Sequence, residues 1–251
     1  MEIKYRAEAT TLEGFIQQLA VGYLCRGYRF YFQGLIPKDK DPRAVDAKLI
    51  ARYGLGISKF ERAKRKAQGL ANVQYLRYGQ HIVLLSTPGK HNPLSDDHKL
   101  KDAHEVPIKL GGYAVSFRGG HASVRIERGA WKKLKAYYLN LATKRSESWL
   151  KTEFHRWPFE PWAPIRRQTF VILNQVNRAR KAAGLELVET SCVRLKRRIY
   201  QPFAELTAIG TVAPVRGRLA GEPQARSGTR PASRSCSENA SQGRLESHPQ
   251  A

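Results

Sequence analysis

The chain has few of the features that mark secreted, membrane-spanning or zinc-binding proteins. Its 251 residues contain three cysteines, Cys25, Cys192 and Cys236, which lie far apart and form no Cys-x-x-Cys pair. This spacing supports neither a disulfide framework nor a zinc finger. No apolar run approaches the roughly 18–20 residues that cross a bilayer, and the N-terminal segment lacks the apolar core of a signal peptide. We therefore expect a cytoplasmic protein that does not bind membranes.

Recognisable catalytic motifs are also missing. The sequence contains no phosphate-binding P-loop, no Gly-x-Ser-x-Gly elbow and no His-hydrophobic-His pair of the kind found in nicking endonucleases. The Arg, His and Tyr arrangement of tyrosine recombinases is not recognisable either. We therefore assign no catalytic residue, no cofactor and no metal ligand, and we favour a binding protein over an enzyme.

Negative charge is scarce in comparison with positive charge. Lys and Arg total 44 against 21 Asp and Glu, which gives a net charge of +23 and a pI of about 10.3. A charge of this size says more about partners than about fold, and nucleic acid is the most common polyanionic partner. Hydrophobic residues make up 41% of the chain, which is enough for a packed core.

The first 88 residues show the pattern helix, strand, helix, helix, strand, strand. Apolar residues at helical spacing predict a helix over residues 11–25, and the alternating aromatic segment RGYRFYFQGLIP predicts a strand. Asp41 and Ser58 are typical N-cap residues of the two helices that follow. The segments ANVQYLRYG and QHIVLLST then predict a hairpin around Gly79.

This order of elements resembles the winged helix-turn-helix superfamily over roughly residues 10–88. LIARYG followed by LGISKFERAKRKAQGL is similar to the turn and recognition helix of bacterial winged-helix regulators, and the hairpin is similar to their wing. The first strand is longer, and the recognition helix more basic, than in most regulators. The resemblance implies a nucleic-acid-binding domain over residues 1–88.

A second unit is predicted after a polar linker over residues 89–105. Alternating apolar residues separated by Gly-Gly pairs predict a three-stranded meander, followed by three helices and a basic strand over residues 192–200. Residues 211–251 contain no Phe, Tyr or Trp, and we expect a disordered tail there. The predicted fold class is α+β: a winged helix, a basic α+β domain over residues 106–210, and the tail.

The candidate binding residues are basic side chains on the predicted helices and hairpin tips. On the helix after Ser58, we expect Phe60, Ala63 and Ala67 to pack against Leu49 and Ile50, so that the basic residues project away. Arginines presented in this way can bind guanine edges or phosphates. The candidate nucleic-acid-binding residues are Lys59, Arg62, Arg65, Lys66, Arg77, Arg118, Lys132, Arg166, Arg167 and Arg178.

Three hypotheses about function follow. The first is a DNA-binding protein, nucleoid-associated if bacterial, that acts in regulation, replication initiation or mobile-element maintenance, with duplex DNA favoured over RNA and a homodimer allowed. The second is a metal-dependent endonuclease or transposase-like enzyme that uses the loop of Asp96, Asp97 and His98. The third is an RNA-binding structural protein.

Four aromatic residues of the second unit allow two interpretations. We favour packing in the core, and stacking on unpaired bases is the alternative, for Trp149, Trp157, Phe159 and Trp162.

Overall fold

The first helix is apolar around most of its circumference, and the rest of the fold is built around it. Helix α1 (Leu12–Gln17) begins at Thr11, whose side chain accepts a hydrogen bond from the Gly14 N–H. It continues as a π-helical stretch, η1 (Gln18–Tyr23), and a 3₁₀ turn, η2 (Leu24–Arg26), and ends at Gly27, whose φ of 93° favours glycine. A helix buried on several sides needs apolar neighbours on several sides.

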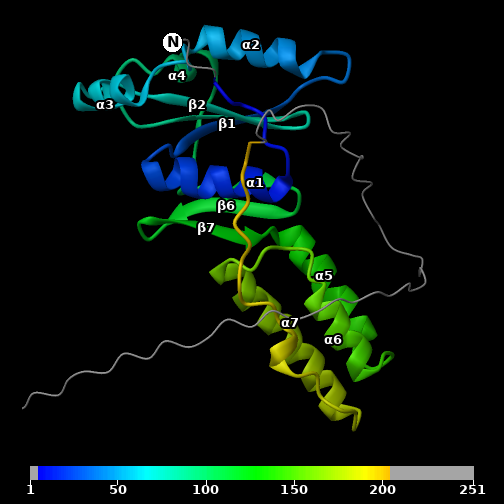
Figure 1. Cartoon of the computed structure of the whole chain (residues 1–251). Helices are drawn as coiled ribbons and strands as arrows, with labels where there is room; N and C mark the ends of the chain where they lie inside the picture. The colour runs from blue at the N-terminus through cyan, green and yellow to red at the C-terminus, as the bar shows by residue number, and fades with distance from the viewer. Residues whose placement is uncertain (1–4, 204–251) are drawn as a thin grey trace, which may run out of the picture. The chain divides into compact units, whose positions relative to one another are not determined.

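Two antiparallel sheets supply those neighbours. The computed structural model describes residues 5–203, and all of them belong to one compact unit. Figure 1 shows α1 between the strands of the first sheet and β6 and β7 of the second. The contacts agree, because α1 packs on β2 while η1 and η2 pack on β6 and β7.

The first sheet has the strand order β2-β3-β1-β4. Its strands are β1 (Phe30–Leu35), β2 (Val73–Tyr78), β3 (His81–Ser86) and the short β4 (Lys101–Asp102), and every pair is antiparallel. The outer edge of β2 is covered, because the backbone of Arg77 exchanges hydrogen bonds with Ala7 and Ala9 at 2.8 and 2.7 Å. The hairpin of β2 and β3 is therefore not a free-standing wing.

Both faces of this sheet are buried. Side chains of a strand alternate between its two faces, so one strand contributes to two different cores. Leu76, Val83 and Leu85 belong to the core that contains α1. Tyr75 and Leu84 belong to a second, smaller core on the other face. Helices α2 (Pro42–Arg52), α3 (Lys59–Ala67) and α4 (Pro93–Asp97) lie near the first sheet (Figure 1). Leu94 of α4 belongs to the second core, and Leu49 of α2 packs against it.

The second sheet is the predicted meander. Strands β5 (Ile108–Leu110), β6 (Tyr113–Arg118) and β7 (His121–Ile126) pair in sequence order. Both glycine pairs between them have positive φ at each residue, which is the requirement of a type I′ hairpin turn. Helices α5 (Arg128–Leu141), α6 (Glu147–His155) and α7 (Ala163–Ala182) follow, with α7 packed on β7 and on α5, and a 3₁₀ turn, η3 (Thr190–Cys192), comes last.

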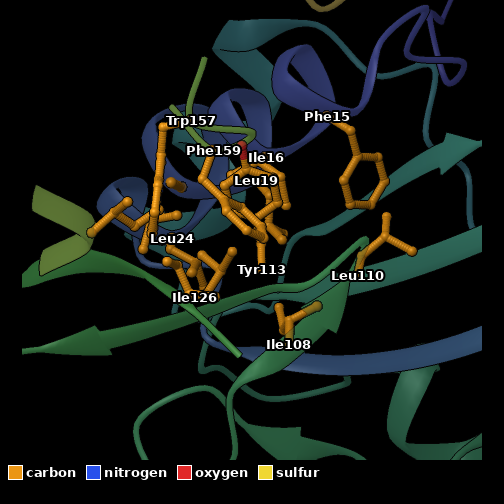
Figure 2. Close-up of a cluster of buried hydrophobic side chains, with 14 of the residues drawn as sticks. Phe15, Ile16, Leu19, Leu24, Ile108, Leu110, Tyr113, Ile126, Trp157 and Phe159 are labelled. Carbon is orange, nitrogen blue, oxygen red and sulfur yellow. The ribbon is translucent and has the colours of Figure 1, made fainter. Parts of the chain in front are cut away.

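One core joins the two parts of the sequence. Figure 2 shows Ile16 of α1 and Leu19 of η1 close to Tyr113 of β6 and to Phe159, which follows α6. All four belong to the same buried cluster, and the Tyr113 and Phe159 rings meet edge to face at 4.9 Å. The division predicted at residues 89–105 thus falls inside one compact unit whose core draws on both sides of it.

The α+β class is confirmed, and the predicted order of helices and strands over residues 10–88 is the order observed. That order alone leaves membership of the winged-helix superfamily a prediction.

The strand predicted over residues 192–200 is wrong, because this segment forms no strand ladder. It makes its hydrogen bonds to side chains instead, as when Gln17 Nε2 donates to the Tyr200 carbonyl at 2.7 Å. The predicted tail, residues 211–251, lies outside the described residues, and no helix within them is long and apolar enough to cross a membrane.

Candidate nucleic-acid interface

Helix α3 turns two of its arginines toward the protein. Arg62 Nη1 donates to the Ile57 carbonyl at 2.6 Å, and Arg65 Nη2 donates to the Ala71 carbonyl at 2.8 Å. The Asn72 side-chain amide in turn donates to the Arg62 carbonyl at 3.0 Å. These three bonds fix the rotation of the helix about its axis, with Arg62 and Arg65 half-buried.

The apolar side of α3 consequently faces solvent, which contradicts the packing expected from the sequence. Phe60 is 85% exposed, and Ala63 and Ala67 are exposed as well. Leu49 and Ile50 of α2 pack against the second core of the first sheet instead of against α3. The hydrophobic period of a helix identifies a face but does not say whether that face is buried.

Three lysines surround this apolar face. Lys59, Lys64 and Lys66 are all exposed. Glu61, the only acidic residue of α3, is engaged in a capping box: it accepts from the Ser58 N–H at 2.7 Å, while its own N–H donates to the Ser58 hydroxyl at 3.1 Å. The Ser58 N–H, and then its side chain, hold the pKa of Glu61 below its usual value. The outer surface of α3 is therefore cationic and apolar.

Arg77 lies at the interior of the fold and not at a hairpin tip. It is 2% exposed, and its Nε donates to both carboxylate oxygens of Asp46 at 2.9 and 3.0 Å. Its remaining nitrogens bond to the Gly79 carbonyl at 2.8 Å and pair with Glu8 at 3.0 Å. A guanidinium satisfied in this way does not reach a phosphate, so the expected phosphate contact of Arg77 is corrected to a structural ion pair.

The candidate binding residues of the second half are likewise either exposed to solvent or bonded to the protein itself. Arg118, Lys132, Arg167 and Arg178 are exposed. Arg166 is half-buried, and its Nη1 donates to the Leu195 carbonyl at 3.0 Å, which attaches the C-terminal segment to α7.

The exposed basic residues of α5 and α7 lie on two neighbouring helices. Neither helix contains an Asp or Glu, and the two helices pack against each other. The exposed basic side chains of the two helices, named here the α5–α7 face, are Arg128, Lys132, Lys133, Arg167, Arg178 and Lys181. Three of them, Lys132, Arg167 and Arg178, were predicted as binding residues from the sequence, and Arg128, Lys133 and Lys181 are exposed on the same helices.

Two more arginines of this region have internal roles that the sequence did not reveal. Arg180 is buried and donates to the carbonyls of Ala142 and Arg145 at 2.7 and 2.8 Å. It thus provides hydrogen-bond donors for backbone carbonyls just after the end of α5. Arg194 pairs with the buried Glu160 at 2.9 Å. Periodicity places Arg180 on the same side of α7 as Ile172 and Val176, which is the signal that marks it as internal.

The loop proposed for metal binding has other contacts. The Tyr53 hydroxyl donates to Asp97 Oδ2 at 2.8 Å, and the side chain of Arg52 pairs with the same carboxylate. Hydrogen bonds from Arg52, and then from Tyr53, lower the pKa of Asp97, and burial followed by the bond to Asp97 raises the pKa of Tyr53 to about 12. The His98 ring stacks on Phe32 at 3.9 Å. Among residues 5–203, no group of three or more His, Cys, Asp or Glu side chains is arranged to hold a metal ion.

The aromatic residues of the second half are used in packing. Trp157 and Phe159 are buried. Trp162 lies under the Arg197 guanidinium at 4.0 Å, and Trp149 lies under that of Arg145 at 5.2 Å. Trp149 and Trp162 are thus half-buried, packed against the core and each in contact with an arginine of the protein itself.

A shallow pocket lies between α6 and η3. It has a volume of about 520 Å³ and is lined by Lys151, Thr152, His155, Arg156, Ser191 and Cys192. Lys151 is paired with Glu189 at 3.1 Å, and burial raises the pKa of the Cys192 thiol to about 11. The thiol is therefore protonated at neutral pH and is not an activated nucleophile.

The geometry of these surfaces is the main guide to function. No protein-family model matches the sequence, and a search of curated proteins finds no significant match.

Proposed function

We propose that this chain is a nucleic-acid-binding protein, with duplex DNA as its favoured ligand, that binds mainly through phosphate contacts. The observation that carries the proposal is the α5–α7 face, where two packed helices present basic side chains and contain no acidic residue. A surface of one charge sign concentrates polyanions and releases their counterions on binding. Regulation, replication initiation and mobile-element maintenance are the roles that suit such binding.

The spacing on α7 suits a phosphate backbone. Arg167 and Arg178 are eleven positions apart and share the exposed side of the helix. At a rise of about 1.5 Å per residue, their Cα atoms lie about 16 Å apart along the helix axis. Lys181 continues the same stripe. Several phosphates can therefore be contacted at once by one rigid element.

Base recognition by Arg62 and Arg65 is not part of the proposal. Both guanidiniums already donate to backbone carbonyls of the protein. Redirecting them to a guanine edge would leave those carbonyls without their partners, at a cost of roughly 1–3 kcal/mol for each buried group. Binding that tolerates many sequences is therefore expected.

The test is the salt dependence of binding, measured by fluorescence anisotropy with random-sequence duplex DNA. We expect a linear fall of log K with log salt concentration. Arg178→Ala should reduce the slope by about 1 because one phosphate contact is lost. Lys109→Ala is the matched control: it also removes one positive charge, but from a lysine paired with Glu127.

Two results would contradict the proposal. Equal effects of Arg178→Ala and Lys109→Ala would show that only net charge matters. Tighter binding of folded RNA than of duplex DNA at the same salt concentration would favour the RNA-binding hypothesis instead.

A further inference from the structure

The outer side of α3 combines an exposed aromatic ring with a ring of cations. Phe60 is 85% exposed and is the most exposed large hydrophobic side chain among residues 5–203. Lys64 lies one turn further along the helix on the side of Phe60, whereas Lys59 and Lys66 lie at the other border of the exposed apolar side. No other large hydrophobic residue of the described chain combines such exposure with a position on so basic a helix.

The exposure of Phe60 is enforced by the fold. The bonds of Arg62 and Arg65 to the Ile57 and Ala71 carbonyls hold the opposite side of α3 against the protein. The capping box of Ser58 and Glu61 fixes the first turn, where Phe60 lies. A rotation of α3 that buried the ring would break these bonds, so Phe60 stays in solvent.

The chemistry of this surface identifies the ligand that complements it. An aromatic ring surrounded by ammonium groups matches a nucleobase with phosphates on either side, because the base stacks on the ring and the phosphates attract the lysines. An intact duplex keeps its bases stacked and offers no free base face. An unpaired base does.

We infer that α3 binds an unpaired base of a nucleic acid, with Phe60 stacked on the base and Lys59, Lys64 and Lys66 close to the neighbouring phosphates. This inference rests on the proposed function and deepens it: the preferred ligand is DNA with a single-stranded segment next to the duplex. The unpaired base supplies the contact with Phe60, and the phosphate contacts of the proposed function do not depend on it.

Three fluorescein-labelled DNAs test the inference: a blunt duplex, a single strand, and a duplex with a single-stranded overhang. The wild-type protein should bind the overhang DNA more tightly than the blunt duplex. Phe60→Ala should weaken binding of the overhang DNA and the single strand by about 5- to 150-fold, the equivalent of one stacked base. Binding of the blunt duplex should not change.

Matched variants separate stacking from other causes. Phe60→Tyr keeps a stacking ring and should bind as the wild type does, whereas Phe60→Leu keeps apolar bulk without a ring and should behave like Phe60→Ala. Leu35→Ala removes another exposed hydrophobic residue, 61% exposed on β1, and should have no effect. A 2-aminopurine placed in the overhang should be quenched by the wild type and not by Phe60→Ala.

The failures are distinguishable. If the wild type binds none of the three DNAs, the proposed function itself fails. If it binds the blunt duplex but Phe60→Ala binds every probe unchanged, only the inference is overturned, and an acidic protein partner becomes the candidate occupant of this surface. Full binding by Phe60→Leu would also overturn it, because stacking needs the ring.

Discussion

Arginine and lysine have different uses at the scale of single residues in this molecule. Arg77 bonds to carboxylates, whereas Arg62, Arg65 and Arg180 bond to backbone carbonyls. The guanidinium is planar and offers five donors, so it can satisfy several acceptors inside a fold. Lysine offers a compact, strongly hydrated charge, and the lysines of α3 and α5 are largely left at the surface.

The buried Arg77 gives the first prediction. Replacement by methionine should lower the free energy of unfolding by about 3–5 kcal/mol, because the carboxylate of Asp46 would remain in the interior without its cation. Urea denaturation followed by circular dichroism measures this loss. Lys109→Ala, which breaks an exposed pair with Glu127, should cost less than about 1 kcal/mol.

A double variant tests whether the unpaired carboxylate of Asp46 causes this loss of stability. Arg77→Met combined with Asp46→Leu leaves no uncompensated charge in the interior, because the second partner of Arg77, Glu8, has a side chain that is 52% exposed, and the double variant should recover part of the lost stability. A double variant as unstable as the sum of the single variants would show that the ion pair is not the source of the loss.

At the scale of helices and strands, most of the fold could be predicted from the sequence, because local signals determine it. Capping residues begin α2, α3 and α6, and the Gly-Gly pairs mark both turns of the meander. These signals involve residues a few positions apart, which is the range that sequence patterns cover.

The orientation of α3 and the path of residues 192–200 could not be predicted in this way. The orientation of α3 depends on the backbone carbonyls that accept hydrogen bonds from Arg62 and Arg65. The path of residues 192–200 depends on Gln17 and Glu160, whose side chains accept hydrogen bonds from the Tyr200 and Arg198 N–H groups. Gln17 and Tyr200 are separated by 183 positions. The candidate site was therefore only partly predictable: Lys59, Lys66 and the exposed arginines of α7 were selected, but Lys64 was not, and the exposed Phe60 was assigned to the interior.

The two glycine turns of the meander give a prediction about elements. Gly112 and Gly120 have nearly the same φ, 81° and 78°, so alanine is strained by a similar amount at both. A Cβ at Gly112 would lie 3.0 Å from the buried Phe159 ring, whereas nothing lies within 4 Å at Gly120. Gly120→Ala should cost about 1–2 kcal/mol, and Gly112→Ala should cost more by an amount that reflects packing alone.

Thermal unfolding of the two variants, compared with the wild type, measures that difference. Equal losses would mean that the turn at Gly112 is not pressed against Phe159 in solution.

The net charge of +23 acts at the scale of the whole molecule. Like charges repel one another more strongly in the compact state than in the expanded chain, and dissolved ions screen the repulsion. We expect the unfolding temperature to rise as sodium chloride is increased from about 20 to about 200 mM, by about 2–4 °C for each kcal/mol of repulsion removed. Scanning calorimetry measures this rise.

The same rise is expected with potassium chloride, since screening depends on ionic strength. An unfolding temperature that falls with salt would show that the favourable exposed pairs, such as that of Lys109 with Glu127, outweigh the repulsion.

The position of α1 between two sheets has a consequence for how the protein is made. During synthesis β1, β2 and β3 of the first sheet can pair when β3 has left the ribosome, but β7, which covers the other side of η1 and η2, is completed about 40 residues later. At roughly 5–20 residues per second, the apolar side of the first helix remains uncovered for about 2–8 s. For those seconds the nascent chain exposes Leu19 and Leu24 to its surroundings, which is the interval in which a chaperone would have its greatest effect on yield.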